Sequence, residues 1–194
     1  ESEALVHVVR CFENSDVPHP EINVDPLRDI DIVETELILR DLSVIENRLS
    51  RLAEKKKLTK DEEDEKKMLE RCQEHLMEER PLRDLGLDPE KRRMLSSFAF
   101  LTLKPELIVL NLDENQTDER SVPELEKIRE MAVSSQTPLV KVFGSLEMEM
   151  ADLDPSEQQE FMEDLGIMEP GRERLIAEAY NLLGLISFFT TGKD

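Results

Sequence analysis

The chain has 194 residues, of which 39% are hydrophobic and 36% charged, and its formal net charge is −20. This length suits one large folded domain or two small ones. The acidic balance argues against DNA binding and against any extended contact with nucleic acid, because carboxylates repel phosphates. No apolar run approaches the ~20 residues that span a bilayer, and no charged-then-apolar leader follows Glu1, so we expect no membrane attachment.

Three short apolar runs, at residues 4–9, 107–110 and 139–143, predict strands that are covered on both faces. Between the second and third runs, Ser121 and Glu124 form an S-x-x-E capping box that predicts the start of a helix. A strand, a helix and a strand at this spacing are typical of a βαβ unit. We therefore predict an α/β fold with a parallel sheet.

Nearly one hundred residues separate the first strand from this unit, which is far more than an ordinary crossover, so we predict an insertion. Apolar residues recur there at spacings of four and three, the pattern of a coiled-coil seam. They are Ile38, Leu42, Ile45, Leu49 and Leu52, followed in a second helix by Leu69, Cys72 and Leu76. Between the two helices, Thr59 and Glu62 form another capping box, and the charged run 61–67 places the turn in water. We expect a short antiparallel helical hairpin.

Two more helices are expected after the third strand. Asp154 begins one that ends near Gly166, and Gly171 begins another that ends at Gly184. Residues 185–191 are rich in β-branched and aromatic side chains, which predicts a strand. Because a strand needs a partner and none follows, we expect the chain to be cut inside a further domain.

A candidate binding motif stands where the second strand ends, the place at which open α/β sheets bind ligands. Asn111 and Glu114 lie three residues apart, so both can point at a planar base. GTPases read guanine with an N-K-x-D motif at such a turn, but here Leu112 replaces the Lys and Glu114 the Asp. The longer carboxylate cannot keep the paired geometry, so we expect weakened selectivity for guanine. Taken alone, N-x-x-E also fits an ordinary turn.

Taken together, several segments resemble the YchF family of Obg-like P-loop nucleotide hydrolases in order and spacing: residues 5–12, 24–30, 104–105, 111–114 and 184–192. The resemblance covers essentially the whole chain, and D-P-L-R-D at 25–29 and N-L-x-E at 111–114 are its most specific parts. It implies a cytosolic ATPase or GTPase that binds ATP at least as well as GTP and associates with ribosomes. It also implies a coiled-coil domain that interrupts the G domain, and a TGS domain that follows it.

The resemblance further implies a nucleotide base-binding site. Asn111 and Glu114 match the altered base-reading motif, and Leu112 would lie against the purine. Phe12 would flank the base from the other side, and Gly144 with Ser145 would form the last nucleotide loop. The alternatives are a core aromatic at a strand end for Phe12 and a simple turn for the Gly-Ser pair.

On this interpretation the chain has four parts. Residues 1–20 are a strand and exit loop of the G domain, and 21–103 are the inserted coiled-coil domain. Residues 104–184 are the C-terminal half of the G domain with the base-reading motif, and 185–194 begin a truncated TGS domain. The 194 residues hold no G-x-x-x-x-G-K-[ST] motif, so nothing here cradles phosphates or Mg²⁺. We expect an internal piece that has no catalytic residue, is inactive alone, and belongs to a parent that binds Mg²⁺ through residues outside this chain.

Contact with the ribosome or ribosomal RNA would have to be local on so acidic a chain, and aromatic side chains for base stacking are scarce at 4%. Two basic spots could serve: Arg51 with Lys55, Lys56, Lys57 and Lys60, and the run Lys91, Arg92 and Arg93. The alternative for each is solvated charge beside acidic neighbours. A rival function is a free-standing helical-hairpin interaction module with no nucleotide activity, in which the sheet is only a scaffold.

Cysteine and histidine offer no further chemistry. Cys11 and Cys72 form no C-x-x-C pair, which suits a reducing cytosol, so we expect a cytoplasmic protein. Cys72 lies on the predicted seam and is expected to be a buried apolar residue. His7, His19 and His75 lack metal-ligand spacing, so we expect no metal site, and His7 is expected to be hydrogen-bonded inside the sheet.

Overall fold

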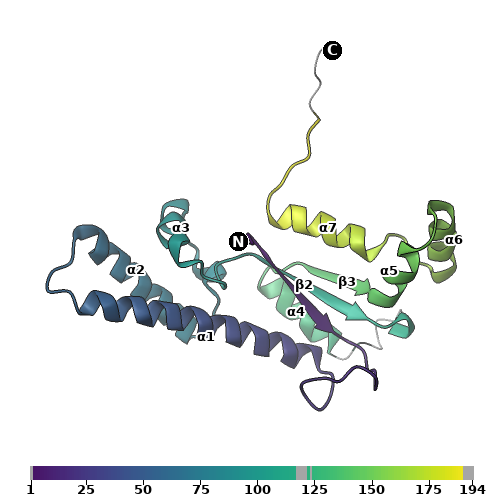
Figure 1. The fold of residues 1–194 in the computed structure, drawn as a ribbon, viewed down its shortest axis with the longest axis horizontal. Helices are drawn as coiled ribbons and strands as arrows, with labels where there is room; N and C mark the ends of the chain where they lie inside the picture. The colour runs from purple at the N-terminus through teal and green to yellow at the C-terminus, as the bar shows by residue number, and fades with distance from the viewer. Residues whose placement is uncertain (1, 117–121, 123, 190–194) are drawn as a thin grey trace. The chain divides into compact units, whose positions relative to one another are not determined.

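The structure, a computed structural model, describes residues 2–116, 122 and 124–189. The chain divides into two compact units. The sheet unit comprises Glu1–Leu27 and Pro105–Asp194, and the hairpin unit comprises Arg28–Lys104. Figure 1 shows a three-stranded sheet with helices in the first and long paired helices in the second. The predicted α/β fold, a parallel sheet interrupted by a helical hairpin, is confirmed.

The sheet has the order β1-β2-β3 with all strands parallel. Its strands are β1 (Leu5–Arg10), β2 (Glu106–Leu112) and β3 (Leu139–Phe143). Strand β2 continues two residues beyond its predicted carboxyl end, so Asn111 and Leu112 belong to the strand. Asn111 then pairs with Arg10 on one side and with Val142 on the other.

Burial on both faces explains why β2 is almost wholly apolar. On one face its side chains pack with those of β3 and α7 (Gly171–Leu182). This cluster comprises Leu107, Val109 and Val140 with the partly buried Val142, Leu175 and Leu182. Helix α4 (Leu125–Ser134) lies on the other side of the strands (Figure 1) and buries three side chains. A helix on each face gives β2 the double cover that its composition predicts. For β1 the prediction is wrong, because Val6 and Val8 are 49% and 60% exposed.

The start of α4 differs from the prediction. Ser121, the expected cap, lies outside the described residues. Glu124 precedes the helix with a left-handed φ of 57°, so it is not in the first turn as an S-x-x-E box requires. The helix that the pattern predicted is present, and its first residue is Leu125.

Helices α6 and α7 begin and end close to the residues predicted from the sequence. Helix α6 (Pro155–Leu165) begins at a capping box in which Asp154 and Glu157 bond each other's backbone, and it ends at Gly166 with φ 66°. Helix α7 also begins where expected, and Gly184 with φ 63° follows its end. Helix α5 (Gly144–Ala151) was not predicted.

The predicted strand at 185–191 is wrong for its described part. Residues 185–189 are exposed and have no regular structure. None of the three described strands pairs with this segment, and β propensity alone does not hold a strand without a hydrogen-bonded neighbour. Residues 190 and 191 lie outside the described part of the chain.

The hairpin unit is built on α1 (Pro26–Ala53) and α2 (Lys60–Met77). The predicted seam is buried: Ile38, Ile45 and Leu52 pack with Leu69, Cys72 and Leu76, and Leu42 and Leu49 are partly buried beside them. The predicted capping box also forms. Thr59 Oγ1 accepts from the Glu62 N–H at 3.3 Å, and Glu62 Oε2 accepts from the Thr59 N–H at 3.0 Å.

Three short helices complete this unit: η1 (Leu82–Leu85), α3 (Pro89–Leu95) and η2 (Ser96–Phe98). Helix α3 was not predicted, although Asp88 caps it by accepting from the Lys91 N–H at 2.9 Å. The basic run at 91–93 therefore lies on a helix. Within the part of the chain that the structure describes, no helix is long and apolar enough to cross a membrane.

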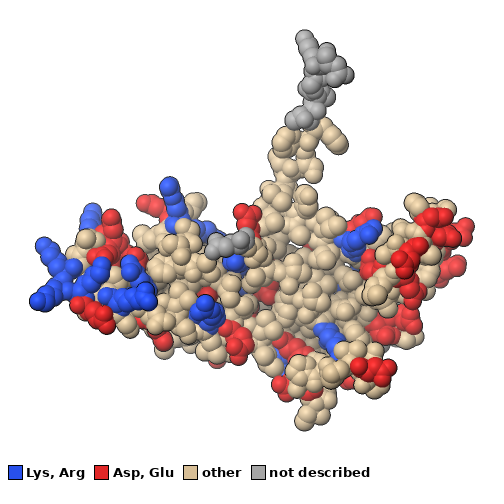
Figure 2. Space-filling view, in the orientation of Figure 1, with Lys and Arg blue, Asp and Glu red and all other residues tan. Residues whose placement is uncertain are grey.

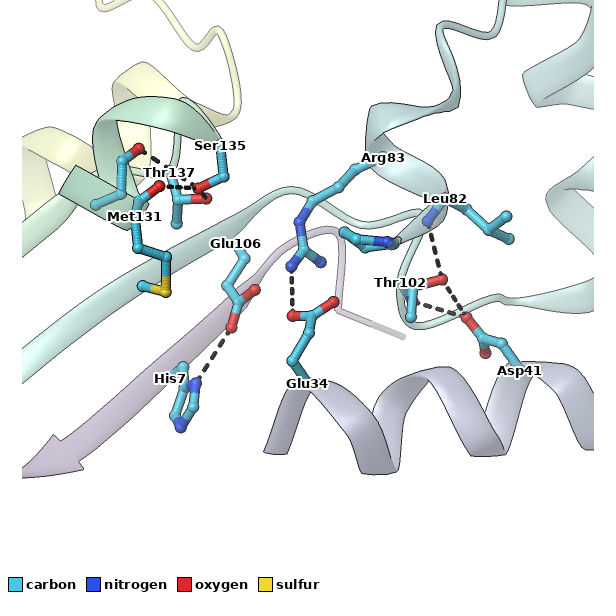
Figure 3. A network of polar contacts seen from close by, with 12 residues as sticks. His7, Glu34, Asp41, Leu82, Arg83, Thr102, Glu106, Met131, Ser135 and Thr137 are labelled. Carbon is cyan, nitrogen blue, oxygen red and sulfur yellow. Dashed lines mark hydrogen bonds and ion pairs between the residues drawn. The ribbon is translucent and has the colours of Figure 1, made fainter. Parts of the chain in front are cut away.

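A buried carboxylate holds the returning chain to α1 (Figure 3). Asp41 is only 1% exposed, and it accepts from the N–H groups of Leu101 at 2.9 Å and Thr102 at 2.8 Å. It also accepts from the Thr102 hydroxyl at 2.7 Å, whose oxygen accepts in turn from the Leu82 N–H at 3.3 Å. Glu34 on α1 likewise forms an ion pair with Arg83. Charge patterning did not reveal these contacts.

We expect Asp41→Asn to lower the free energy of unfolding by about 2–4 kcal/mol, because an amide replaces one acceptor oxygen with a donor that faces other donors. Urea denaturation would measure this. Glu46→Gln is the matched control, because Glu46 is exposed on the same helix. Equal midpoints for the two variants would show that the Asp41 network contributes little.

Candidate functional site

The candidate site lies at the edge of the sheet where β1 and β2 end. Parallel strands bring their carboxyl ends to one edge, and the register places Arg10 beside Asn111 there. The Cys11 N–H donates to the Asn111 carbonyl at 2.9 Å, which extends the pairing by one bond. The segment after β1 and the turn after β2 are therefore neighbours, as the predicted site requires.

The structure brings Asn111 and Gly144 into contact. Asn111 Oδ1 accepts from the Gly144 N–H at 3.2 Å. A Cβ at Gly144 would lie 2.9 Å from that same oxygen, so only glycine fits without displacing the amide. Gly144 and Ser145 are the first residues of α5 and not part of a loop. The amide oxygen of Asn111 therefore meets the N-terminus of a helix, where backbone N–H groups and the helix dipole favour an acceptor.

Glu114 begins the turn after β2, the short helix η3 (Glu114–Gln116), and its side chain is exposed. The preceding Asp113 fixes this turn. Its carboxylate accepts from the Asn115 N–H at 3.0 Å and from the Asn115 side-chain amide at 2.7 Å. The turn thus holds Glu114 in a defined backbone position with its carboxylate in solvent, where it can meet a ligand.

Gln116 ties this turn to the segment after β1, and sequence reasoning missed it. Its Oε1 accepts from the Asp113 N–H at 2.8 Å, and its Nε2 donates to the Cys11 carbonyl at 2.7 Å. One side chain therefore bridges the two strand exits that carry Glu114 and Phe12. A glutamine two residues after a candidate motif gives no sequence signal, because only the fold brings it to Cys11.

Phe12 is half-buried beneath an arginine that sequence reasoning also missed. The guanidinium carbon of Arg10 lies 4.9 Å from the centroid of the Phe12 ring, which is within cation–π range. The same group donates to three carbonyls: Nε to Phe12 at 2.9 Å, one terminal nitrogen to Val17 at 2.8 Å, and the other to Asn14 at 3.2 Å. Arg10 therefore organises the loop and fixes the ring at its start.

Leu112, the expected wall for a purine, is buried at the carboxyl end of β2. Successive strand residues point to opposite faces, so Leu112 faces away from the Asn111 side of the sheet. It is 2% exposed, and with Phe143 and Leu125 it lines a cavity of about 350 Å³. The expected contact of Leu112 with a base stays a prediction.

His7 and Cys72, the other candidates for chemistry, are packed inside the fold. His7 Nδ1 lies 3.3 Å from Glu106 Oε1, between β1 and β2 (Figure 3), so His7 is paired inside the sheet as expected. Burial raises the pKa of the Cys72 thiol to about 11, which keeps it protonated and unreactive at neutral pH. Among the described residues, no group of three or more His, Cys, Asp or Glu could hold a metal ion.

No family model matches the chain, whereas individual relatives match it over nearly its whole length. The "Ribosome-binding ATPase YchF" of Haemophilus influenzae is 40% identical over 193 residues, and that of Bacillus subtilis is 36% identical over 194 residues. Each alignment covers 99% of this chain and 53% of the relative. A solved YchF GTPase from Schizosaccharomyces pombe has a TM-score of 0.85 at 26% identity, covering 99% of this chain and 53% of that one.

This stretch of sequence is similar to YchF proteins over nearly its whole length. The resemblance to YchF that was based on residues 25–29 and 111–114 is therefore confirmed. The chain spans about half the length of the curated YchF relatives it matches. The match to the yeast YchF structure extends over both the sheet unit and the hairpin unit, because it covers 99% of the chain.

Gln116 variants test the bridge between the strand exits. In Gln116→Leu both hydrogen bonds are lost, so we expect exchange of the Asp113 amide to accelerate about fivefold or more, equivalent to one bond of ~1 kcal/mol. Gln116→Glu keeps the acceptor for Asp113 but faces the Cys11 carbonyl with a carboxylate oxygen. It should protect Asp113 and loosen the β1 exit instead.

Amide exchange followed by NMR separates these effects. Gln159→Leu, on the exposed surface of α6, is the control and should leave both sites unchanged. An Asp113 amide that exchanges at the wild-type rate in Gln116→Leu would contradict the bridge.

Proposed function

We propose that this chain is the base-reading part of a ribosome-associated purine nucleotide hydrolase that uses ATP at least as well as GTP. The observation that carries the proposal is the Asn111 side chain, held by the Gly144 N–H at the carboxyl edge of a parallel sheet. The relatives named "Ribosome-binding ATPase YchF" support both the nucleotide and the ribosome as partners.

In this proposal Asn111 orients the β3–α5 junction, so that the backbone of Gly144 and Ser145 borders the base. Glu114 supplies the carboxylate that meets its polar edge, and Phe12 covers one of its faces. Leu112 would lie against the purine, as the resemblance implies, at the cavity that it lines. The arrangement favours a bound base over an ordinary turn, because the Asn111 amide leaves no room for a side chain at position 144.

The weakened selectivity for guanine follows from the carboxylate. Guanine offers an N1–H and an exocyclic amine side by side, and a short Asp accepts from both with charge assistance. Adenine has a bare N1, which accepts and does not donate, so a site built around that Asp leaves a carboxylate oxygen without its donor. Glu114 lies one methylene further out on an exposed turn, where water can satisfy it when adenine is bound.

We also propose the domain boundaries that the resemblance to the family implies. Residues 1–20 and 104–184 would be parts of the G domain, 21–103 the inserted coiled-coil domain, and 185–194 the start of a TGS domain. Mg²⁺ would accompany the triphosphate in the longer protein. The described residues offer no group of His, Cys, Asp or Glu to hold it, so no step proposed for this chain passes through the metal.

The rival proposal, a hairpin interaction module without nucleotide activity, has its own supporting observation. The hairpin unit has a buried core of its own, so it does not need the sheet for its packing. The Asn111–Gly144 contact, the Gln116 bridge and the Arg10–Phe12 contact favour the nucleotide proposal, because a mere scaffold needs none of them.

Glu114→Asp in the full-length protein tests base selection. We expect the ratio of GTP affinity to ATP affinity to rise about tenfold, the effect of one added charge-assisted hydrogen bond of ~1.5 kcal/mol. Calorimetric titrations at fixed Mg²⁺ would measure both affinities. Glu130→Asp, an exposed position on α4, is the control. A wild-type protein that already prefers GTP tenfold would sink the proposal, and an unmoved variant would show that Glu114 is not the selector.

The isolated 194-residue chain should show no ATP or GTP turnover and should bind nucleotide more weakly than millimolar. Backbone N–H groups and a lysine of the phosphate-binding loop supply most of the affinity in P-loop proteins, and that motif is absent from this sequence. Micromolar ATP binding by this chain in a calorimetric titration would contradict the expectation.

A further inference from the structure

The turn of the hairpin has a charge opposite to that of the chain. Residues 51–60 contain five basic side chains and one acidic side chain, a net charge of +4 in a chain of −20. We call the basic ones the turn patch: Arg51, Lys55, Lys56, Lys57 and Lys60. Figure 2 shows blue side chains gathered at the free end of the hairpin. All five are exposed.

Most of this positive charge is not neutralised locally. Lys55 forms an ion pair with Glu62, and that contact, with the Thr59 N–H, lowers the Glu62 pKa to about 2. Within the described part of the chain, no ion pair is seen for the four other members of the turn patch.

The acidic run that begins α2 is partly neutralised from elsewhere. Asp64 pairs with Lys67 at 4.0 Å, and Glu65 pairs with Arg48. Asp61 and Glu63 lie in the first turn of α2, where the helix dipole stabilises negative charge. The free charges beside the turn are therefore mainly those of the lysines.

The turn is also held in one shape. The Thr59–Glu62 capping box fixes its end, and Leu52 and Leu58 anchor it in the core of the hairpin unit. A fixed backbone that presents consecutive lysines loses little conformational entropy when it meets a partner.

The chemistry of the turn patch fits phosphate. Lysine ammonium groups are strongly hydrated point charges that bind phosphate without demanding a fixed geometry. Residues 48–67 contain no aromatic side chain, so base stacking has no platform there. Helix α1 has 28 residues and is ~42 Å long, so the acidic side chains near its start lie about five Debye lengths from the turn at physiological salt.

We propose that the turn patch is a docking surface for the phosphate backbone of RNA, with no selectivity for base sequence. The proposal rests on the proposed ribosome association and names the surface through which RNA is contacted. An acidic protein surface is the other partner class that such charge attracts. RNA is favoured because four of the five members of the patch are lysines and none is aromatic, whereas protein interfaces are typically anchored by aromatic and arginine side chains.

The experiment compares two triple variants of the full-length protein that each remove three positive charges. The test variant is Lys56→Ala, Lys57→Ala and Lys60→Ala. The control is Lys66→Ala, Lys67→Ala and Lys127→Ala, whose lysines are engaged by Glu70 at 3.6 Å, Asp64 at 4.0 Å and Glu124 at 2.6 Å. Binding to purified ribosomes and to protein-free ribosomal RNA is measured from about 50 to 300 mM salt.

We expect the test variant to bind both probes about tenfold or more weakly at physiological salt, and its slope of log K against log salt to fall by about 2. The control should keep the wild-type slope, and all three proteins should share one melting temperature and one ATPase rate. Equal slopes for test and control, or weakened ribosome binding with unchanged RNA binding, would overturn the RNA proposal. A wild-type protein that binds no ribosomes would instead refute the proposed ribosome association itself.

Discussion

Strand β2 carries the constraint on which the candidate site depends. It pairs in parallel with β1 on one side and β3 on the other, so the three exits meet at one edge. Because its residues alternate between faces, Asn111 is directed toward the N-terminus of α5, and Leu112 is directed into the core. A register shift of one residue would exchange these two roles. The pairing therefore decides which of the two side chains contacts the N-terminus of α5.

The contacts at this edge show how the fold fixes the loops around a motif that has only a weak sequence signal. Asn111 is fixed by one backbone N–H, the turn after it by Asp113, and the adjoining exit by Gln116 and Arg10. Each contact joins a side chain to backbone, so the loops are held by groups that the fold must supply anyway. Contacts of this kind would position the residues of the proposed site without touching the base themselves.

Much of the fold could be predicted because its signals are local. The seam residues recur at helical spacing along each helix, and the Thr59 capping box and the glycine that ends α6 depend on neighbours within a few residues. The misses required long-range information. Asp41 finds its partners sixty residues away, and Gln116 reaches Cys11 across more than one hundred. The predicted strand is wrong over residues 185–189 for the opposite reason: local β propensity was read as a strand, but none of the described strands pairs with this segment.

The Asp41 network also bears on how the chain joins its first two strands. Between Arg10 and Glu106 lie 95 residues, and closing so long a loop delays the pairing of β1 with β2. Once Asp41 holds Thr102, only about 34 of those residues still span the gap. By the logarithmic law of loop closure this shortening is worth only about 1 kcal/mol. An insertion whose ends are joined by its own contacts therefore adds little to the entropic cost of pairing β1 with β2. Its length can change while the register of the two strands stays the same.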